Sequence, residues 1–321
     1  MARRRVKACP PLPPRDGLGP TRVRLPGDTP VTAFDFIARV IAEQRHRHPL
    51  DDDTAVLERF DRGEVVLRDA TPLAPSTLLE PGTDVFFYRR PAPETPIPHE
   101  IDIVHEDDDI LVVNKPPFLA TMPRAAHITE TATVRLRRQY GNEEITPAHR
   151  LDRLTSGLLL LTKRREIRGA YQEMFAQRGV RKLYEAIGPD VGISAPTRWE
   201  HHIEKRHGEI ASSLVDGAQP NAFTRVRSVT PMGASPWGAG LARYLLEPET
   251  GRTHQLRVQM NAAGAPIVGD PVYPVVRAFG DKDFTRPMLL ASIGLEFVDP
   301  LSGAPRRFTA GGHTGLPVEG W

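Results

Sequence analysis

Apolar residues near the N-terminus recur three and four positions apart, which is the spacing of an amphipathic helix. Thr32 and Asp35 have the spacing of a helix N-cap box, and the apolar face that follows predicts a helix up to Gln44. A second short helix is predicted over residues 54–60. Strands are predicted over residues 64–69 and 83–90. Together these elements predict a small α+β module over residues 21–90.

Beyond residue 100 the pattern changes to short apolar runs that are typical of buried strands. Strands are predicted over residues 110–116, 158–162, 183–188, 242–248 and 293–299. A helix with one apolar face begins at Ile167, and Gly179 is expected to cap its C-terminus. Further helices are predicted over residues 131–139 and in the segment that ends at Gly264. The pattern therefore predicts a mixed sheet with a few helices, which is an α+β fold.

Prolines mark the expected boundaries between domains. Residues 91–98 contain four prolines, so we expect an extended linker over residues 91–99. Residues 1–20 are basic and rich in proline, which predicts a disordered tail, with an RNA-binding arm as the alternative. The expected folded domains are therefore residues 21–90 and residues 100–321.

Composition limits the class of protein. The 321 residues carry a net charge of +2 with a pI of about 8.8, which allows a nucleic-acid partner without requiring one. Cys9 is the single cysteine, so no internal disulfide can form. Apolar runs are far shorter than the ~20 residues of a membrane span, and the basic start leads into prolines rather than a signal sequence. We therefore expect a cytoplasmic protein that does not enter the membrane.

No metal site is expected from the sequence. His201, His202 and His207 lie close together, but the HExxH spacing is missing and no cysteine is near. The acidic residues 105–109 are expected to form a turn before a strand rather than a cation site.

A candidate active site is suggested by a polar loop that runs directly into an apolar strand. Asp152 lies in this loop between two arginines. Burial alone would raise the pKa of such a carboxyl above about 3.9 and neutralise it, so a nearby cation is needed. Arg257, on the apolar face of a predicted helix, needs a carboxylate in turn. Asp152 and Arg257 are thus expected partners, either in a catalytic site or in a buried ion pair that only stabilises the fold.

The segment HRLDRLTSGLLLLTK, residues 149–163, resembles the HRLDxxTSGLLLLAK signature of the RluA pseudouridine synthases. Further matches follow in the order of that family: EDDDILVVNKP (106–116), KLYEA (182–186), AFTRV (222–226), TGRTHQLRVQM (250–260), IVGDPVY (267–273) and RPMLLAS (286–292). The resemblance covers nearly all of residues 100–300. It implies a catalytic domain of the pseudouridine synthase type, with a mixed, mostly antiparallel sheet and no cofactor.

The resemblance also implies roles for individual residues. Asp152 matches the catalytic aspartate, and Arg257 matches the cation paired with it. Tyr184 matches the tyrosine that stacks on the target base and is the proposed acceptor of the C5 proton, and Arg150 matches the arginine that fills the space left by the flipped base. The other residues expected to contact RNA or the base are His149, Thr155, Arg252, His254 and Leu290.

The module over residues 21–90 resembles a degenerate S4-type RNA-binding domain. The resemblance lies in two helices followed by a Gly-x-Val strand at Gly63 and Val65 and by a Pro-Gly turn. Five arginines form either a phosphate-facing patch or a solvated helix face: Arg39, Arg45, Arg47, Arg59 and Arg62. The resemblance thus implies a second region that contacts RNA.

The leading hypothesis is an enzyme that isomerises specific uridines in structured RNA, with ribosomal RNA as the expected substrate and transfer RNA second. It is expected to act as a monomer without a required protein partner. The alternative is a catalytically inactive RNA-binding or ribosome-assembly factor on the same fold, because Gln259 and Leu290 stand where the family usually has histidines. A glycosidase-like hydrolase is disfavoured because one carboxylate, rather than two, lies in a suitable setting.

Overall fold

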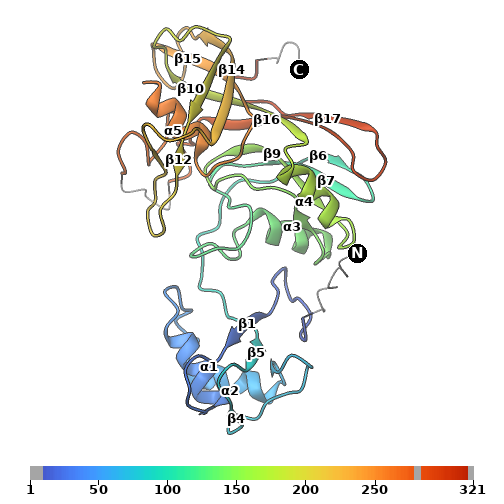
Figure 1. Ribbon diagram of the computed structural model, residues 1–321. Helices are drawn as coiled ribbons and strands as arrows, with labels where there is room; N and C mark the ends of the chain where they lie inside the picture. The colour runs from blue at the N-terminus through green and yellow to red at the C-terminus, as the bar shows by residue number, and fades with distance from the viewer. Residues whose placement is uncertain (1–9, 278–282, 317–321) are drawn as a thin grey trace. The chain divides into compact units, whose positions relative to one another are not determined.

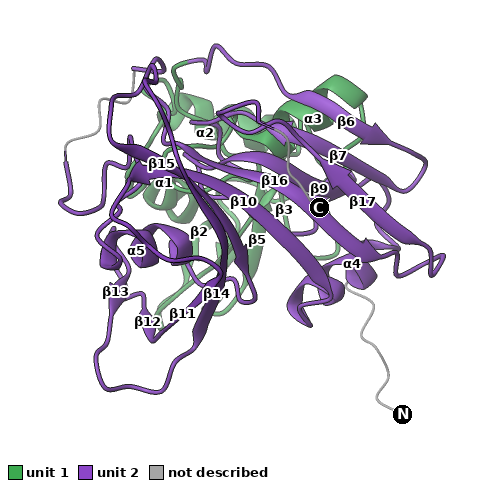
Figure 2. Ribbon diagram, turned by 90° about the horizontal axis from the view of Figure 1, so that it is seen from above, with its two compact units in different colours: residues 1–95, 122–143 green, residues 96–121, 144–321 purple. Residues whose placement is uncertain are grey.

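The chain folds into two compact units. The computed structural model describes residues 10–277 and 283–316. One unit is formed by residues 1–95 and 122–143, and the other by residues 96–121 and 144–321 (Figure 2). The chain leaves the first unit within the proline-rich segment 91–99, whereas the return of residues 122–143 to that unit is not predicted by the sequence pattern. Residues 1–9 of the expected tail, with Cys9, lie outside the described residues.

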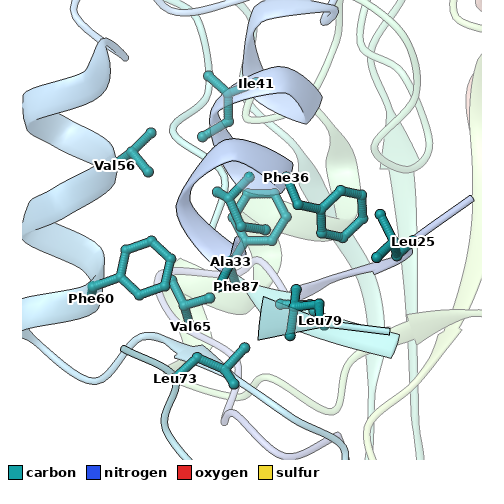
Figure 3. Close-up of a cluster of buried hydrophobic side chains, with 12 residues drawn as sticks. Leu25, Ala33, Phe36, Ile41, Val56, Phe60, Val65, Leu73, Leu79 and Phe87 are labelled. Atoms are coloured by element: carbon teal, nitrogen blue, oxygen red, sulfur yellow. The ribbon is translucent and has the colours of Figure 1, made fainter. Parts of the chain in front are cut away.

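The first unit packs two helices and short strands around one apolar core. Its elements before residue 95 are β1 (Thr21–Arg24), β2 (Val31–Thr32), α1 (Ala33–Ala42), α2 (Asp53–Asp61), β3 (Val65–Val66), β4 (Leu78–Leu79) and β5 (Asp84–Phe87). The sheet is antiparallel in the order β1-β5-β3, and β2 pairs separately with β4. The Thr32 hydroxyl accepts a hydrogen bond from the Asp35 N–H and so caps α1, as the spacing predicts. Figure 3 shows Phe36, Phe60 and Phe87 in the buried cluster that joins the helices to the sheet.

The N-terminal turn is tied to a later helix of the same unit. Within residues 10–20, the Asp16 carboxylate lies 2.6 Å from the guanidinium of Arg138 in α3 (Ala132–Tyr140). The Gly17 N–H donates to the Glu143 carboxylate at 2.7 Å. Residues 10–20 therefore have defined contacts, contrary to the disordered tail expected over residues 1–20.

A single carboxylate explains why the segment before α3 also belongs to this unit. Glu94 accepts hydrogen bonds from the N–H groups of Ile128, Thr129 and Glu130 at 2.7–3.2 Å. Three consecutive N–H groups that converge on one anion form a stable anion-binding turn. Glu94 thus fixes the loop that leads into the Thr131 N-cap of α3.

The second unit is built on one large twisted sheet (Figure 1). Its strands are β6 (Asp102–Glu106), β7 (Ile110–Lys115), β8 (Thr146–Pro147), β9 (Ser156–Thr162), β10 (Val180–Pro189), β11 (Thr197–His201), β14 (Ala222–Pro231), β15 (Leu241–Pro248), β16 (Leu290–Val298) and β17 (Pro305–Thr309). Their order is β11-β14-β15-β10-β16-β9-β7-β6, with β17 on β16 and β8 on β9. Within the described part of the sheet, neighbouring strands pair antiparallel except β9 with β16, which are parallel. The expected α+β fold with a mixed, mostly antiparallel sheet is confirmed.

Helices α4 and α5 pack on this sheet. The sequence predicted the C-terminal end of each helix to within about a turn. Helix α4 (Arg168–Ala176) buries Tyr171 and Met174 against strands β7, β9 and β16. Its left-handed C-terminal residue is Arg178 (φ 62°), while Gly179 follows and donates its N–H to the Met174 carbonyl, so the expected glycine cap is displaced by one residue. Helix α5 (Gln255–Ala262) ends before left-handed Gly264, as expected.

The parallel pairing of β9 with β16 depends on a glycine. Gly157 in β9 has φ 104°, and a Cβ there would lie 2.2 Å from the carbonyl oxygen of Ser292 in β16. No other residue type fits such a close approach of two backbones. Gly157 therefore allows the start of β9 to pack closely against β16. The polar loop that carries Asp152 ends at this fixed point.

Two general findings concern function. No helix within residues 10–277 and 283–316 is long and apolar enough to cross a membrane. Over the same residues, no group of three or more His, Cys, Asp or Glu side chains is arranged to hold a metal ion.

Candidate active site

Hydrogen bonds to the backbone hold the loop that carries Asp152 in place. The Thr121 hydroxyl accepts from the Leu151 N–H at 3.1 Å and donates to the Leu151 carbonyl at 2.7 Å. The Thr155 N–H donates to the Asp152 carbonyl, which closes a turn. The backbone is thus fixed on both sides of Asp152, while its side chain keeps 32% exposure. A fixed backbone with an accessible carboxylate suits a reacting group.

A buried lysine supports the same loop. Lys115 ends β7 and is fully buried, and its ammonium donates to the carbonyls of Pro116 and Leu119 at 2.8 Å and reaches the Arg153 carbonyl at 3.4 Å. Burial lowers the pKa of Lys115 to about 7, against the opposing effect of the Asp152 charge. The sequence motif NKP gave no reason to expect this side chain beneath the candidate site.

The expected pairing of Asp152 with Arg257 is present, but it is not the main contact of the arginine. Arg257 binds Asp270 through two hydrogen bonds of 2.7 and 2.8 Å, whereas its third nitrogen lies 3.5 Å from Asp152. Asp270 is itself held by the N–H groups of Val272 and Tyr273. Sequence reasoning missed Asp270, although it is the single acidic residue in the matched segment IVGDPVY.

The second carboxylate changes the charge balance of the site. Burial acts to lower the pKa of Arg257, but the hydrogen bond to Asp270 and the charges of Asp270 and Asp152 outweigh it, so the pKa is raised. The arginine remains a cation with its charge largely compensated by a bidentate partner. Asp152 therefore faces a cation at 3.5 Å without being locked in a bidentate ion pair.

His254 completes the surroundings of Asp152. It precedes α5 in a left-handed conformation with φ 57°, which is unusual for a non-glycine residue. Its Nδ1 lies 3.2 Å from the Tyr273 hydroxyl, and its Nε2 lies 3.8 Å from the Asp152 carboxylate. Burial lowers the pKa of His254 to about 4, opposed by the Asp152 charge. The imidazole is thus neutral at pH 7.

These groups line a cavity of about 590 Å³. Its lining side chains are Asp152, Arg153, Leu154, Ile210, His254, Arg257, Pro271, Val272, Val276 and Arg277. Three arginines, one histidine and one carboxylate stand among otherwise apolar side chains. A pocket with apolar walls and a few convergent charges is the usual form of a site for a small polar group on an anionic backbone.

Tyr184 lies in β10 opposite Ser292 of β16 and is half-buried. Burial raises the pKa of Tyr184 to about 12, with a further contribution from the negative charge of Asp152, while Ser292 acts in the opposite direction. The phenol is therefore protonated at neutral pH and interacts electrostatically with Asp152. Its side chain is not among those that line the cavity.

Two of the other expected RNA contacts are engaged within the fold. The His149 ring stacks on Phe175 at a centroid distance of 4.3 Å, and its Nε2 accepts from the Leu160 N–H. Burial lowers the pKa of His149 to about 3, so it is neutral. Leu290 is buried in β16, where its carbonyl accepts from the Ser156 hydroxyl. Both positions hold the scaffold of the loop rather than line the cavity.

The remaining expected contacts fall into two classes. Thr155 is buried and supports the Asp152 turn through its N–H. Arg150 and Arg252 are exposed, and Arg252 donates to the Asn221 carbonyl at 3.2 Å. None of the three lines the cavity, although the two arginines stay accessible to a large substrate.

The replacement of a family histidine by Gln259 has a structural explanation. Gln259 is fully buried, accepts from the Thr224 hydroxyl at 2.7 Å and lies 3.2 Å from Nδ1 of His201. Gln255 joins the same network through Thr224. The amide is thus satisfied in a network of its own and does not line the cavity of Asp152. The fold thus accommodates a glutamine at this position.

Comparisons with known proteins identify the family to which the chain is similar. Residues 109–262 match the family described as RNA pseudouridylate synthase. The chain is 34% identical over 216 residues to "Dual-specificity RNA pseudouridine synthase RluA" of Vibrio parahaemolyticus, covering 63% of this chain and 79% of the relative. It is 30% identical over 270 residues to "Ribosomal large subunit pseudouridine synthase D" of Neisseria meningitidis, covering 77% and 68%.

A solved structure supports the same assignment. "Human RNA Pseudouridylate Synthase Domain Containing 1" is 27% identical with a TM-score of 0.55, and the match covers 68% of this chain and 85% of that chain. "Human RNA Pseudouridylate Synthase Domain Containing 4", at 22% identity and a TM-score of 0.50, shows the same fold. The chain belongs to the RluA-type family of RNA pseudouridine synthases.

Proposed function

We propose that this RNA pseudouridine synthase isomerises specific uridines in structured RNA, with Asp152 as the catalytic carboxylate. The observation that carries the proposal is the accessible Asp152 carboxylate, 3.5 Å from an arginine that a second carboxylate already binds. An ion pair that only stabilised the fold would use both partners fully. Here Asp270 binds Arg257, and Asp152 remains available to a substrate.

The chemistry requires one anion beside a sugar. Conversion of uridine to pseudouridine breaks the bond between N1 and C1′, rotates the base, joins C5 to C1′ and exchanges the C5 proton for a proton at N1. Positive charge develops at C1′ as the first bond breaks, and a carboxylate stabilises or captures that centre. Asp152 takes this role, and Arg257 holds the carboxylate in position from 3.5 Å away.

Removal of the C5 proton is assigned to Tyr184. The ring provides a surface on which the uracil stacks, and the oxygen accepts the proton. Because burial raises the pKa of Tyr184 to about 12, the phenol carries its own proton when the reaction begins. It gives that proton to N1 of the departing uracil, and its oxygen then accepts the C5 proton, so that one proton leaves C5, one arrives at N1 and the phenol is restored. Arg150, exposed beside Asp152 in the sequence, is assigned to the space that the extruded base leaves.

The first unit is proposed to bind RNA through a cleft of its own. The cleft has a volume of about 1080 Å³ and is lined by eight arginines and four acidic residues, with contributions from the N-terminal turn, α2, the end of β5 and α3. All four carboxylates are engaged: Asp16 with Arg138, Glu58 with Arg62, Glu64 with Arg15, and Glu94 with backbone N–H groups. Among the described residues, Arg45 and Arg89 have no acidic partner. Such an excess of positive charge favours a phosphate backbone.

Ribosomal RNA is the favoured substrate and transfer RNA the second. The Neisseria relative is named for the large ribosomal subunit, and the Vibrio relative is named as having dual specificity. An S4-like region that adds affinity for structured RNA suits a large RNA target. We propose that the protein acts as a monomer without a required partner.

The proposal is tested by release of tritium from RNA labelled at uracil C5. Wild-type protein should release tritium from ribosomal RNA transcripts faster than from transfer RNA, and Asp152→Asn should release none while binding RNA and unfolding as wild type does. Release by Asp152→Asn at the wild-type rate would exclude Asp152 as the catalytic carboxylate. Binding without release by the wild-type protein would instead favour an RNA-binding factor.

A further inference from the structure

The cavity of Asp152 is flanked by a hairpin whose tip is held rigid from within. Strands β12 (Ile203–Glu204) and β13 (Ser213–Leu214) pair as a separate two-stranded sheet. The ammonium of Lys205 donates to the carbonyls of Glu209, Ile210 (2.6 Å) and Ala211 (3.2 Å). One cation bound to three consecutive carbonyls fixes the path of an otherwise exposed tip.

The hairpin is hydrogen-bonded to the site at Ser212, where the tip leads into β13. The Tyr273 hydroxyl accepts from the Ser212 N–H at 2.8 Å and donates to the Ser212 carbonyl at 2.9 Å. The Ser212 hydroxyl donates to the Thr253 carbonyl at 2.9 Å. Tyr273 also contacts His254, which lies beside Asp152. The position of the tip is therefore set by the same groups that surround the catalytic carboxylate.

The rigid tip presents an apolar side chain to solvent. Ile210 is 65% exposed and lines the cavity, together with the arginines Arg153 and Arg277. A single exposed isoleucine is ordinary on a protein surface. Here it projects from a tip held by Lys205, at the mouth of a site whose substrate must be taken out of a stack of bases.

We propose that Ile210 is a wedge that enters the RNA stack beside the target uridine and helps to extrude it. Apolar side chains that insert between bases are an established way to unstack a nucleic acid, and the neighbouring arginines would hold the phosphates on either side. The inference rests on the proposed function, because it concerns the same site and the same extruded base. Lys205 is a positioning residue, since it acts through the tip.

The kinetic test compares stacked and unstacked targets. The probes are a stem-loop excised around a uridine that the wild-type protein modifies and the same stem-loop with that uridine mismatched. We expect Ile210→Ala to slow single-turnover tritium release about tenfold on the paired target and less than about twofold on the mismatched one, because a mismatched base costs less to extrude. Ile210→Leu should retain the wild-type rate. Val298→Ala, which alters an equally exposed residue away from the cavity, should have no effect on either.

A second readout separates this inference from the proposed chemistry. In an Asp152→Asn background, a 2-aminopurine placed beside the target uridine of a ribosomal RNA stem-loop should brighten on binding, and Ile210→Ala should remove most of that increase. Lys205→Met should lower it without changing the salt dependence of binding, because its ammonium is already bound. Equal slowing of both targets, or unchanged fluorescence, would overturn the wedge. Loss of tritium release in wild type with fluorescence intact would overturn only the proposed function.

Discussion

The two units hold cavities of different character. In the second unit, one carboxylate stands at 32% exposure among partners that each have a defined geometry, and Arg257 is 4% exposed with two hydrogen bonds to Asp270. In the first unit, the cleft is larger and its charge comes from many arginines, several of them exposed. The difference indicates that the cavity of the second unit depends on the exact position of a few side chains. The cleft of the first unit depends on the summed charge of many arginines. Single substitutions should therefore act strongly on one cavity and weakly on the other.

The largest effect is expected at the carboxylate that compensates Arg257. Asp270→Asn should lower the free energy of unfolding by about 3–5 kcal/mol, because it leaves a buried guanidinium without its main counter-charge. Chemical denaturation followed by circular dichroism measures it. Glu58→Gln, which breaks the exposed pair with Arg62, should cost less than about 1 kcal/mol. Similar losses in both variants would contradict the contrast between the two cavities.

Substitutions at Tyr184 distinguish the contribution of the aromatic ring from that of the hydroxyl, and so test how far the active site depends on single atoms. Tyr184→Phe should bind RNA nearly as well as wild type, because stacking needs only the ring, while the single-turnover rate falls by about 10²-fold or more through loss of the proton acceptor. RNA deuterated at C5 should show a larger isotope effect with Tyr184→Phe than with wild type. Tyr184→Ala should also lose affinity. A wild-type rate for Tyr184→Phe would remove the hydroxyl from the mechanism.

The environment of His254, beside Asp152, can be tested through the pH dependence of the free energy of unfolding. Its folded pKa of about 4 lies below the ordinary value of 6.5, so the unfolded chain binds more protons between these values and stability is lost as the pH falls from 6.5 to 4. As the pH falls through this range, the free energy of unfolding of His254→Gln should therefore decrease by about 2 kcal/mol less than that of wild type. Denaturation at pH 7, 5.5 and 4 measures it. Parallel pH profiles of the two proteins would show that burial does not perturb this imidazole.

The smallest effect is expected in the first unit. Arg45→Gln with Arg89→Gln should reduce RNA affinity by about tenfold at low salt and lower the slope of log K against log salt by about 1–2, since each phosphate contact contributes a little under one unit. The rate at saturating RNA should not change. Arg39→Gln, at an exposed arginine that does not line the cleft, is the matched control. An unchanged salt slope in the double variant would exclude the cleft as a phosphate site.

The sequence by itself determined most of the helices and several of the buried strands, and it predicted Asp152 as the reacting group. Periodicity and the Thr32 cap placed the helices, apolar runs placed the buried strands, and the motif of residues 149–163 singled out Asp152. These signals are local, because a cap, a period or a loop-to-strand transition involves neighbours in the chain. Even the shift of the expected cap from Gly179 to Arg178 is a difference of one residue.

Only the tertiary structure decided how charges are shared. Asp270, rather than Asp152, is the main partner of Arg257, and Lys115 lies beneath a loop far along the sequence. Residues 122–143 join the first unit through Glu94, whose carboxylate finds three N–H groups more than thirty residues away. A buried charge takes the partner that the fold brings within hydrogen-bonding distance, and distance in space is not encoded in the spacing of residue types along the chain.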